Sequence, residues 1–464
     1  MRLAPAPAIF CIALSAFAAG RAFLSFADAR PALDAQHGNL PAELHNATEA
    51  RWNAWARQQD KTIRARLEQG DLDSMVNLLL FGTSFTRQPR IRIENLSQAS
   101  KTGILKARVD DMVAGLRQPA GNERLEFLSG LLRARGLDPG TPEGARETGM
   151  FILSNLERVA EEARTLVQRA AQAERRAGSP NDPSALLDRA SLFADRGVSL
   201  DTSIFPDFSI EQTLRDLKKR GVLREGQVAK VAVIGPGLDF IDKNEASGYD
   251  YYPQQTVQPF AFYDSLLRLK LAPAGGVSMA IFDISSRVID HIQKARERAR
   301  KGSGYVIQLP RDIARPWPDD VAAYWKALGD QVGMPIAPIQ PPDIFKPLNG
   351  GRGLDTRAVE IRPAVVLALD PQDLNIVLER ASLAPEQRFD LMIATNIFVY
   401  YDPFEQTLAL ENAGAMLKSG GLLLTNDRLP ELPGGAMKLA GVTDVPLASQ
   451  GVVSHQVVGW YRRR

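Results

Sequence analysis

Cysteine and histidine are scarce in this sequence. The 464-residue chain has one cysteine, Cys11, and four histidines. A single thiol excludes an intrachain disulfide framework and any site that needs several thiolate ligands. We therefore expect no metal site. The sequence also lacks a G-x-S-x-G stretch, and this absence argues against a serine hydrolase built around a nucleophile elbow.

A marked excess of charge of either sign is also missing. The chain has 56 Lys and Arg against 54 Asp and Glu, which gives a formal net charge of +2. No dense basic stripe interleaved with aromatic residues occurs, so no nucleic-acid partner is indicated. Hydrophobic residues make up 45% of the chain. This composition and length are typical of a globular protein with two or three domains.

The N-terminus has the pattern of a targeting segment. Arg2 precedes a mostly apolar stretch that ends in small residues at Ala16–Ala18, and a second small-residue cluster follows at Ala27–Ala29. We predict that residues 1–29 are a secretory signal peptide and that the protein is exported, to the periplasm or outside the cell. Because Arg21 interrupts the apolar run, we expect no transmembrane span. An ordinary N-terminal helix in a cytoplasmic protein is the alternative.

Residues 30–177 have the periodicity of helices. Trp52, Ala56 and Ile63 fall on one helical face, and a second long stripe begins near Phe151. These stripes contain no cluster of catalytic side chains, so we predict a structural helical domain. Residues 178–200 begin with a Gly-Ser-Pro-Asn-Asp-Pro run of turn-forming residues and are interpreted as a linker.

From residue 201 onward, apolar runs of strand length alternate with amphipathic helices. This alternation predicts βαβ units, and we expect residues 201–464 to form an α/β domain with a doubly wound, mostly parallel sheet. We expect an insertion at residues 311–354, with a helix near residues 321–328 and many prolines. The predicted strands are 228–234, 277–282, 305–309, 359–369, 390–394 and 422–425, followed by an antiparallel pair at 437–445 and 452–461.

Chemically distinctive residues follow several of these predicted strands. The first strand ends in Gly235 and Gly237, the second in Asp283, a later one in Asp370, and the next in Asn396. Because the carboxyl ends of parallel strands share one edge of the sheet, this pattern predicts a nucleotide-like cofactor at that edge. Each residue taken alone also has a plain structural interpretation as a turn, a helix cap or a packing residue.

In this order and spacing, the stretches VAVIGPGLDF, MAIFDIS, LALDPQDLN, FDLMIATNIFVYYD and MLKSGGLLLTND resemble the class I S-adenosylmethionine-dependent methyltransferases. The resemblance covers residues 201–464. It implies a seven-stranded Rossmann-like sheet whose last two strands form a hairpin. The third glycine usual in the first motif is absent, because Leu238, Asp239 and Phe240 follow Gly237.

The resemblance also implies roles for single residues in binding S-adenosylmethionine. Gly235 and Gly237 would lie beside the methionine part of the cofactor, Asp283 would bind both ribose hydroxyls, and Asp370 would contact the adenine. Asn396 would stand at the active-site edge. A carboxylate suits the ribose because it accepts two hydrogen bonds from a diol.

The resulting functional hypothesis is a methyltransferase acting on an unidentified small-molecule or protein acceptor. We expect Asn396, Tyr400, Tyr401 and Asp402 on the acceptor side, because they follow the fourth strand. One alternative is a non-catalytic binding or scaffold protein on a degenerate methyltransferase fold, which an exported location without cofactor supply would favour. Another is a nicotinamide-dependent oxidoreductase, although Phe240 replaces the third glycine of that fingerprint.

Substrate selectivity is expected from the additions to the common fold. These are the helical domain and the proline-rich insertion. Within the insertion, Trp317, Tyr324 and Trp325 are candidates for a substrate mouth, and core packing is their alternative role.

Overall fold

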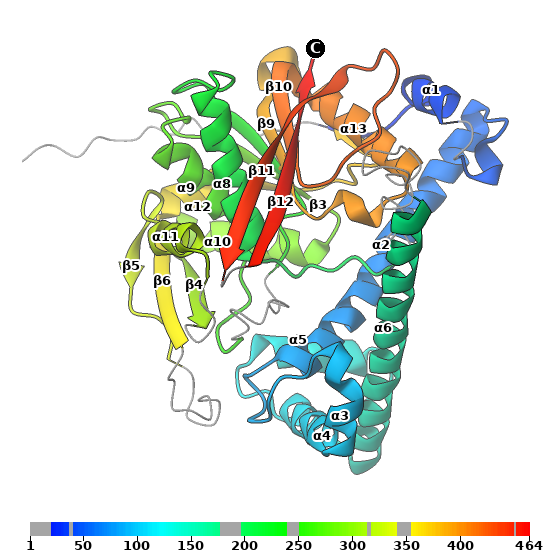
Figure 1. Ribbon diagram of the computed structural model, residues 1–464, viewed down its shortest axis with the longest axis vertical. Coiled ribbons are helices and arrows are strands. Elements are labelled where there is room, and N and C mark those ends of the chain that lie inside the picture. The colour runs from blue at the N-terminus through cyan, green and yellow to red at the C-terminus, as the bar shows by residue number, and fades with distance from the viewer. Residues whose placement is uncertain are drawn as a thin grey trace, which may run out of the picture.

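A computed structural model describes residues 20–36, 40–176, 196–238, 250–312, 317–340, 354–449 and 452–464. An α/β domain occupies one part of the molecule, and a helical arm extends from it (Figure 1). No helix in the described ranges is long and apolar enough to cross a membrane. Within the same ranges, no group of three or more His, Cys, Asp and Glu side chains could hold a metal ion.

The main sheet has seven strands in the order β11-β12-β10-β9-β2-β3-β7. The neighbouring pairs from β10 to β7 are parallel, whereas β12 is antiparallel to both β10 and β11. The expected doubly wound sheet with a final hairpin is therefore confirmed. Its strands are β2 (Lys230–Ile234), β3 (Ser278–Asp283), β7 (Leu369–Asp373), β9 (Phe389–Ala394), β10 (Leu417–Thr425), β11 (Met437–Ser449) and β12 (Val452–Arg463).

Helices cover both faces of this sheet because alternate residues of its central strands point to opposite sides. On β2, Val231 and Val233 belong to one core and Ala232 and Ile234 to the other. Three helices, α8 (Ile204–Lys219), α9 (Gln258–Arg268) and α10 (Ser286–Arg300), contribute buried residues to the first core. Helix α13 (Pro403–Met416) contributes to the second.

The helical arm is organised around two long helices that lie side by side, α2 (Glu49–Phe81) and α6 (Pro142–Arg176) (Figure 1). The side chain of Thr48 caps the first turn of α2 by accepting a hydrogen bond from the backbone N–H of Arg51. The arm's own core also includes residues of α4 (Ile104–Arg117) and α5 (Glu123–Arg133), and α3 (Leu96–Lys101) lies beside α4.

Helix α2 joins the arm to the α/β domain. Its first half places Trp52, Ala56 and Ile63 in the second core of the sheet, whereas its second half belongs to the core of the arm. One helix therefore takes part in two hydrophobic cores. The sequence periodicity placed these residues on one helical face but did not indicate what that face packs against.

The first described residues also belong to the α/β domain. Strand β1 (Arg21–Phe23) pairs with β8 (Glu379–Ala381), and Trp52 donates an indole hydrogen bond to the carbonyl of Leu24 at 2.8 Å. The candidate cleavage cluster Ala27–Ala29 lies inside helix α1 (Phe26–Ala35). Residues 1–19, which include the apolar part of the predicted signal, lie outside the described residues, as does most of the predicted linker.

The predicted strand at residues 359–369 is wrong. The chain forms β6 (Leu354–Ile361), then α12 (Pro363–Leu367), and only then β7. Pro363 at the first position of α12 suits a helix start, because its missing N–H is not needed there. Strand β6 pairs with β4 (Tyr305–Asp312) and β5 (Gly333–Ile336) in a separate three-stranded sheet.

The expected helix of the insertion is confirmed as α11 (Asp319–Ala327). Most of the proline-rich remainder, residues 341–353, lies outside the described residues. Four short 3-10 helices complete the described elements, at Ala42–Leu44, Ile93–Asn95, Pro385–Gln387 and Phe398–Tyr400.

Candidate functional site

A cavity lies at the carboxyl edge of the central strands. The ends of these strands are in register, since Ile234 of β2 stands beside Phe282 of β3 and Ala394 of β9. The cavity has an empty volume of about 450 Å³, part of it open to solvent. We call it the sheet-edge cavity, and it is lined by Val198, Ser199, Leu200, Ile234, Gly235, Gly237, Phe282, Asp283, Ile284, Leu374, Ile376, Ile397, Tyr400 and Tyr401.

Asp283 is the acidic side chain that lines this cavity. It is the last residue of β3, is 5% exposed, and its Oδ1 accepts a hydrogen bond from the backbone N–H of Ser285 at 2.8 Å. Its Oδ2 is buried and has no hydrogen-bond partner among the described residues. Burial raises the pKa of this carboxyl to about 7. A buried acceptor without a partner is costly, and a ligand that donates hydrogen bonds would satisfy it.

The two glycines of the first motif also line the cavity, and both have positive φ angles, 60° for Gly235 and 73° for Gly237. A Cβ on Gly235 would stand 2.1 Å from Cδ1 of Ile397, and one on Gly237 would stand 2.5 Å from the carbonyl oxygen of Leu200. The segment before α8 lies against this turn, since the N–H of Leu238 donates to the Leu200 carbonyl at 2.9 Å. The atoms that approach these glycines closely therefore belong to the protein itself and not to a ligand.

We predict that Gly235→Ala lowers the free energy of unfolding by about 1–3 kcal/mol, because it combines a strained left-handed backbone with a displacement of the Ile397 side chain. Gly221→Ala is the matched control: Gly221 has φ +71°, but a Cβ added there would have no atom within 4 Å. Gly221→Ala should lower the free energy of unfolding only by the smaller contribution from backbone strain. Urea unfolding of both variants measures the difference, and equal losses would refute the contribution from Ile397.

The expected position of Asp370 is wrong. Asp370 is the second residue of β7, opposite Ala280 in the middle of β3, and it forms an ion pair with Arg296 at 3.6 Å. The strand begins later than the apolar run predicted, because the preceding residues form α12. The acid at the carboxyl end of β7 is Asp373, which stands directly opposite Asp283.

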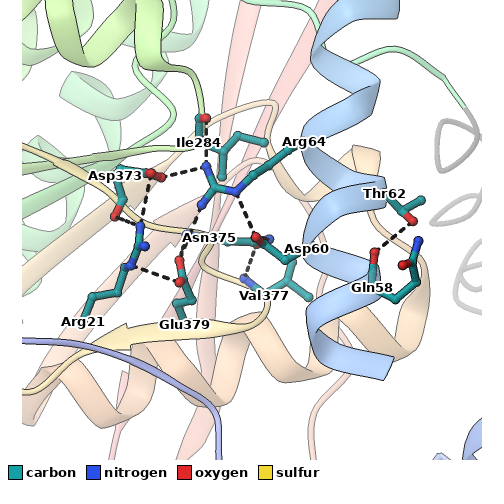
Figure 2. Close-up of polar contacts among 10 residues, drawn as sticks. All are labelled: Arg21, Gln58, Asp60, Thr62, Arg64, Ile284, Asp373, Asn375, Val377 and Glu379. Carbon is teal, nitrogen blue, oxygen red and sulfur yellow. Dashed lines mark hydrogen bonds and ion pairs between the residues drawn. The ribbon is translucent and has the colours of Figure 1, made fainter. Parts of the chain in front are cut away.

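Asp373 belongs to an ion-pair network that fastens α2 to this edge of the sheet (Figure 2). Arg64 of α2 contacts Asp373 at 2.8 Å and Asp60 at 3.0 Å, and it donates a hydrogen bond to the carbonyl of Ile284 at 3.2 Å. Ile284 directly follows Asp283. Sequence reasoning missed Arg64, since an arginine on a helical stripe of a separate region carries no signal for a partner more than 200 residues away.

Of the residues that follow β9, some line the sheet-edge cavity and others do not. Tyr400 and Tyr401 line the sheet-edge cavity, and burial raises the pKa of Tyr401. Asn396 is exposed and does not line it; its Oδ1 accepts a hydrogen bond from Asn426 at 2.6 Å. Asp402 caps α13, where its Oδ1 accepts a hydrogen bond from the backbone N–H of Glu405 at 2.8 Å. The structure therefore brings only the two tyrosines to the cavity.

No protein-family model matches this chain, and no curated protein matches it. Among solved structures, TrmN from Thermus thermophilus matches at 10% identity and a TM-score of 0.24, covering 56% of this chain and 52% of TrmN. The match thus spans about half the length of TrmN. Magnesium protoporphyrin IX methyltransferase from Synechocystis PCC 6803, solved with bound SAM, matches at 11% identity and a TM-score of 0.25, covering 63% of this chain and 90% of the other.

The mitomycin 7-O-methyltransferase MmcR matches at 13% identity and a TM-score of 0.27, covering 90% of this chain and all (100%) of the other. These likenesses are low, so the fold assignment rests on the strand order and the final antiparallel hairpin. The sheet has the seven strands and the final hairpin that the resemblance to the class I methyltransferases implied.

Proposed function

We propose that this protein is an S-adenosylmethionine-dependent methyltransferase. The observation that carries the proposal is the buried Oδ2 of Asp283, which lacks a partner among the described residues and lines a cavity at the carboxyl end of β3. In a doubly wound fold, ligands bind outside the carboxyl ends of the strands. The two glycines of the β2 turn line the same cavity.

The residues present fit this cofactor. Asp283 would accept hydrogen bonds from the two ribose hydroxyls, and the turn at Gly235 and Gly237 would lie beside the methionine part. Leu374 and Ile376 give the cavity an apolar wall suited to an adenine ring. When bound, S-adenosylmethionine supplies an electrophilic methyl group on a sulfonium.

The chain's contribution to methyl transfer would be mainly positioning. The leaving thioether is neutral, so an in-line approach of the acceptor matters more than proton transfer. Tyr400 and Tyr401 line the cavity and are proposed for the acceptor side. The identity of the acceptor and the export of the protein stay predictions.

Calorimetric titration with S-adenosylmethionine and, separately, with NADH tests the proposal. We expect micromolar affinity for S-adenosylmethionine and no heat of binding with NADH. Binding of NADH alone would instead favour the oxidoreductase alternative, and the methyltransferase proposal would fail.

A non-catalytic binding protein is the second candidate. The observation that favours it is the packing of Leu200 and Thr202 against Gly237, where a bound cofactor would otherwise approach the backbone. This candidate predicts that neither S-adenosylmethionine nor NADH binds in the same titration.

A further inference from the structure

A second cavity lies between the start of α8, the segment before α9, strand β4 and helix α11, and its empty volume of about 470 Å³ is partly open to solvent. We call it the tryptophan cavity after two of its lining residues, Trp317 and Trp325. It neighbours the sheet-edge cavity, because residues 198–200 line one cavity and residues 202–204 line the other. Both tryptophans are candidates for a substrate mouth from the sequence.

Three buried polar atoms in the walls of the tryptophan cavity have no hydrogen-bond partner within the described ranges. They are Oδ1 of Asp207, Nε2 of Gln308 and Nε1 of Trp317. Asp207 is 1% exposed and Gln308 is 2% exposed, so solvent does not readily satisfy these groups. The other amide atom of Gln308, Oε1, already accepts a hydrogen bond from the N–H of Ile339 at 3.2 Å. Such a set of unsatisfied groups is expected where a polar ligand binds.

The rest of the wall indicates the shape of that ligand. Trp317, Trp325 and Tyr252 line the cavity together with the apolar residues Leu309 and Pro310. Arg311, which forms an ion pair with Asp355, lies over one face of the Trp325 ring. Aromatic walls with a few convergent polar groups suit a planar ring system that bears an oxygen function.

The polar groups also indicate the charge of the ligand. Burial raises the pKa of Asp207 well above its usual value, which favours the neutral form of its carboxyl. A neutral carboxyl both donates and accepts a hydrogen bond, and it requires no counter-charge from a ligand. The amide of Gln308 and the indole of Trp317 add two donors, which a hydroxyl oxygen can accept.

A polar connection leads from this cavity to the end of β9. Gln258 hydrogen-bonds the carboxyl of Asp207, and its Nε2 donates to Oγ1 of Thr395 at 3.0 Å. Two residues further along the chain, Ile397 lines the sheet-edge cavity. The second cavity is therefore linked to the segment where the acceptor side was expected.

We propose that the tryptophan cavity binds a neutral, planar aromatic compound with a hydroxyl group, whose oxygen pairs with Asp207, Gln308 and Trp317. That this compound is the methyl acceptor rests on the function proposed above. As acceptor, its hydroxyl oxygen would bond to the methyl carbon, the electrons of the broken carbon–sulfur bond would stay on sulfur, and the hydroxyl proton would pass to solvent.

Binding of 2-naphthol and naphthalene, measured by calorimetry without S-adenosylmethionine, tests the cavity independently of methyl transfer. The two probes share a planar ring system and differ by one hydroxyl. We expect 2-naphthol to bind at least tenfold more tightly than naphthalene. In Gln308→Met and Asp207→Leu, which keep approximate side-chain size and remove the polar groups, this preference should fall to less than threefold. Asp283→Asn, in the other cavity, should keep it.

Three results would overturn the proposal: no binding of 2-naphthol, equal binding of the two probes to the parent protein, or an unchanged preference in both wall variants. If Asp207→Leu does not fold, Gln308→Met decides alone. The titrations with 2-naphthol contain no S-adenosylmethionine, so their outcome does not depend on methyl transfer. A protein that binds 2-naphthol as expected but does not bind S-adenosylmethionine would refute the methyltransferase function, and the proposed aromatic site would still be supported.

Discussion

Asp283→Asn is expected to weaken S-adenosylmethionine binding by about 100-fold at pH 8 while making the ligand-free protein more stable. The affinity falls because the charged carboxylate would accept two hydrogen bonds from the ribose diol, and hydrogen bonds to charged groups contribute roughly 1.5–3 kcal/mol each. The amide keeps the oxygen that accepts from Ser285 but loses the second acceptor. Calorimetry and thermal unfolding of the same preparations measure both effects.

The gain in stability follows from the raised pKa of Asp283. Burial moves this pKa from 3.8 to about 7, so between these values the folded state holds a proton that the unfolded chain releases. Stability is therefore lost as the pH rises from about 4 to 7 and stays lower above that range. Asparagine cannot ionise, so it removes this loss at pH 8.

Asp427→Asn is the matched control for Asp283→Asn. Burial also raises the pKa of Asp427 to about 7, but Asp427 does not line the sheet-edge cavity. Its amide variant should bind S-adenosylmethionine within about threefold of the parent protein. If Asp283→Asn also keeps the parent's affinity, Asp283 does not bind the cofactor.

Arg64→Met is expected to lower the free energy of unfolding by about 1–3 kcal/mol. Arg64 joins α2 to Asp373, to the carbonyl of Ile284 and, at 3.7 Å, to Glu379, whose side chain is 1% exposed (Figure 2). Methionine preserves most of the aliphatic packing but leaves these acceptors with fewer partners. The loss arises mainly at Glu379, because a buried carboxylate that loses a partner is poorly solvated, whereas Asp373 is 48% exposed and contributes less. Urea unfolding gives the change.

Arg57→Met is the control for Arg64→Met. Arg57 lies on the same helix and is exposed. Its replacement should change stability by less than about 0.5 kcal/mol, as is usual for surface positions. A similar loss in both variants would show that helix propensity, and not the network, explains the effect.

The sheet was predictable because its central strands are short apolar runs that end in glycine, acid or asparagine. Buried strands of a parallel sheet read as continuous hydrophobic runs, and this pattern located β2, β3 and β9. The same rule placed Asp283 and the two glycines at the sheet edge, where the structure finds them lining one cavity.

The rule failed at Asp370 because hydrophobicity alone does not distinguish a short buried helix from a strand. The apolar residues before Asp370 form α12, so the acid that reaches the edge of the sheet is Asp373. The contacts of Arg64 and the partners of β6 could not be predicted for a different reason. They join segments far apart in the sequence, and local periodicity contains no information on such pairing.

Asp207 illustrates a third limit. It lies in the first turn of α8, where a favourable interaction with the helix dipole is a sufficient explanation for an acid. Only the fold shows that it is buried beside Gln308 and two tryptophans in a cavity. The chemical interpretation of such a residue depends on neighbours that tertiary packing supplies.

The most direct test of the central claim is the dissociation constant of S-adenosylmethionine between pH 6 and pH 8, for the parent protein and for Asp283→Asn. Protonation of the ligand changes both dissociation constants by the same factor, so this effect cancels in their ratio. With a carboxyl pKa of about 7, the ionised fraction rises about tenfold over this interval, so the parent's advantage over the variant should grow by about tenfold. A ratio that stays constant with pH, or a parent protein that does not bind S-adenosylmethionine, would contradict the account.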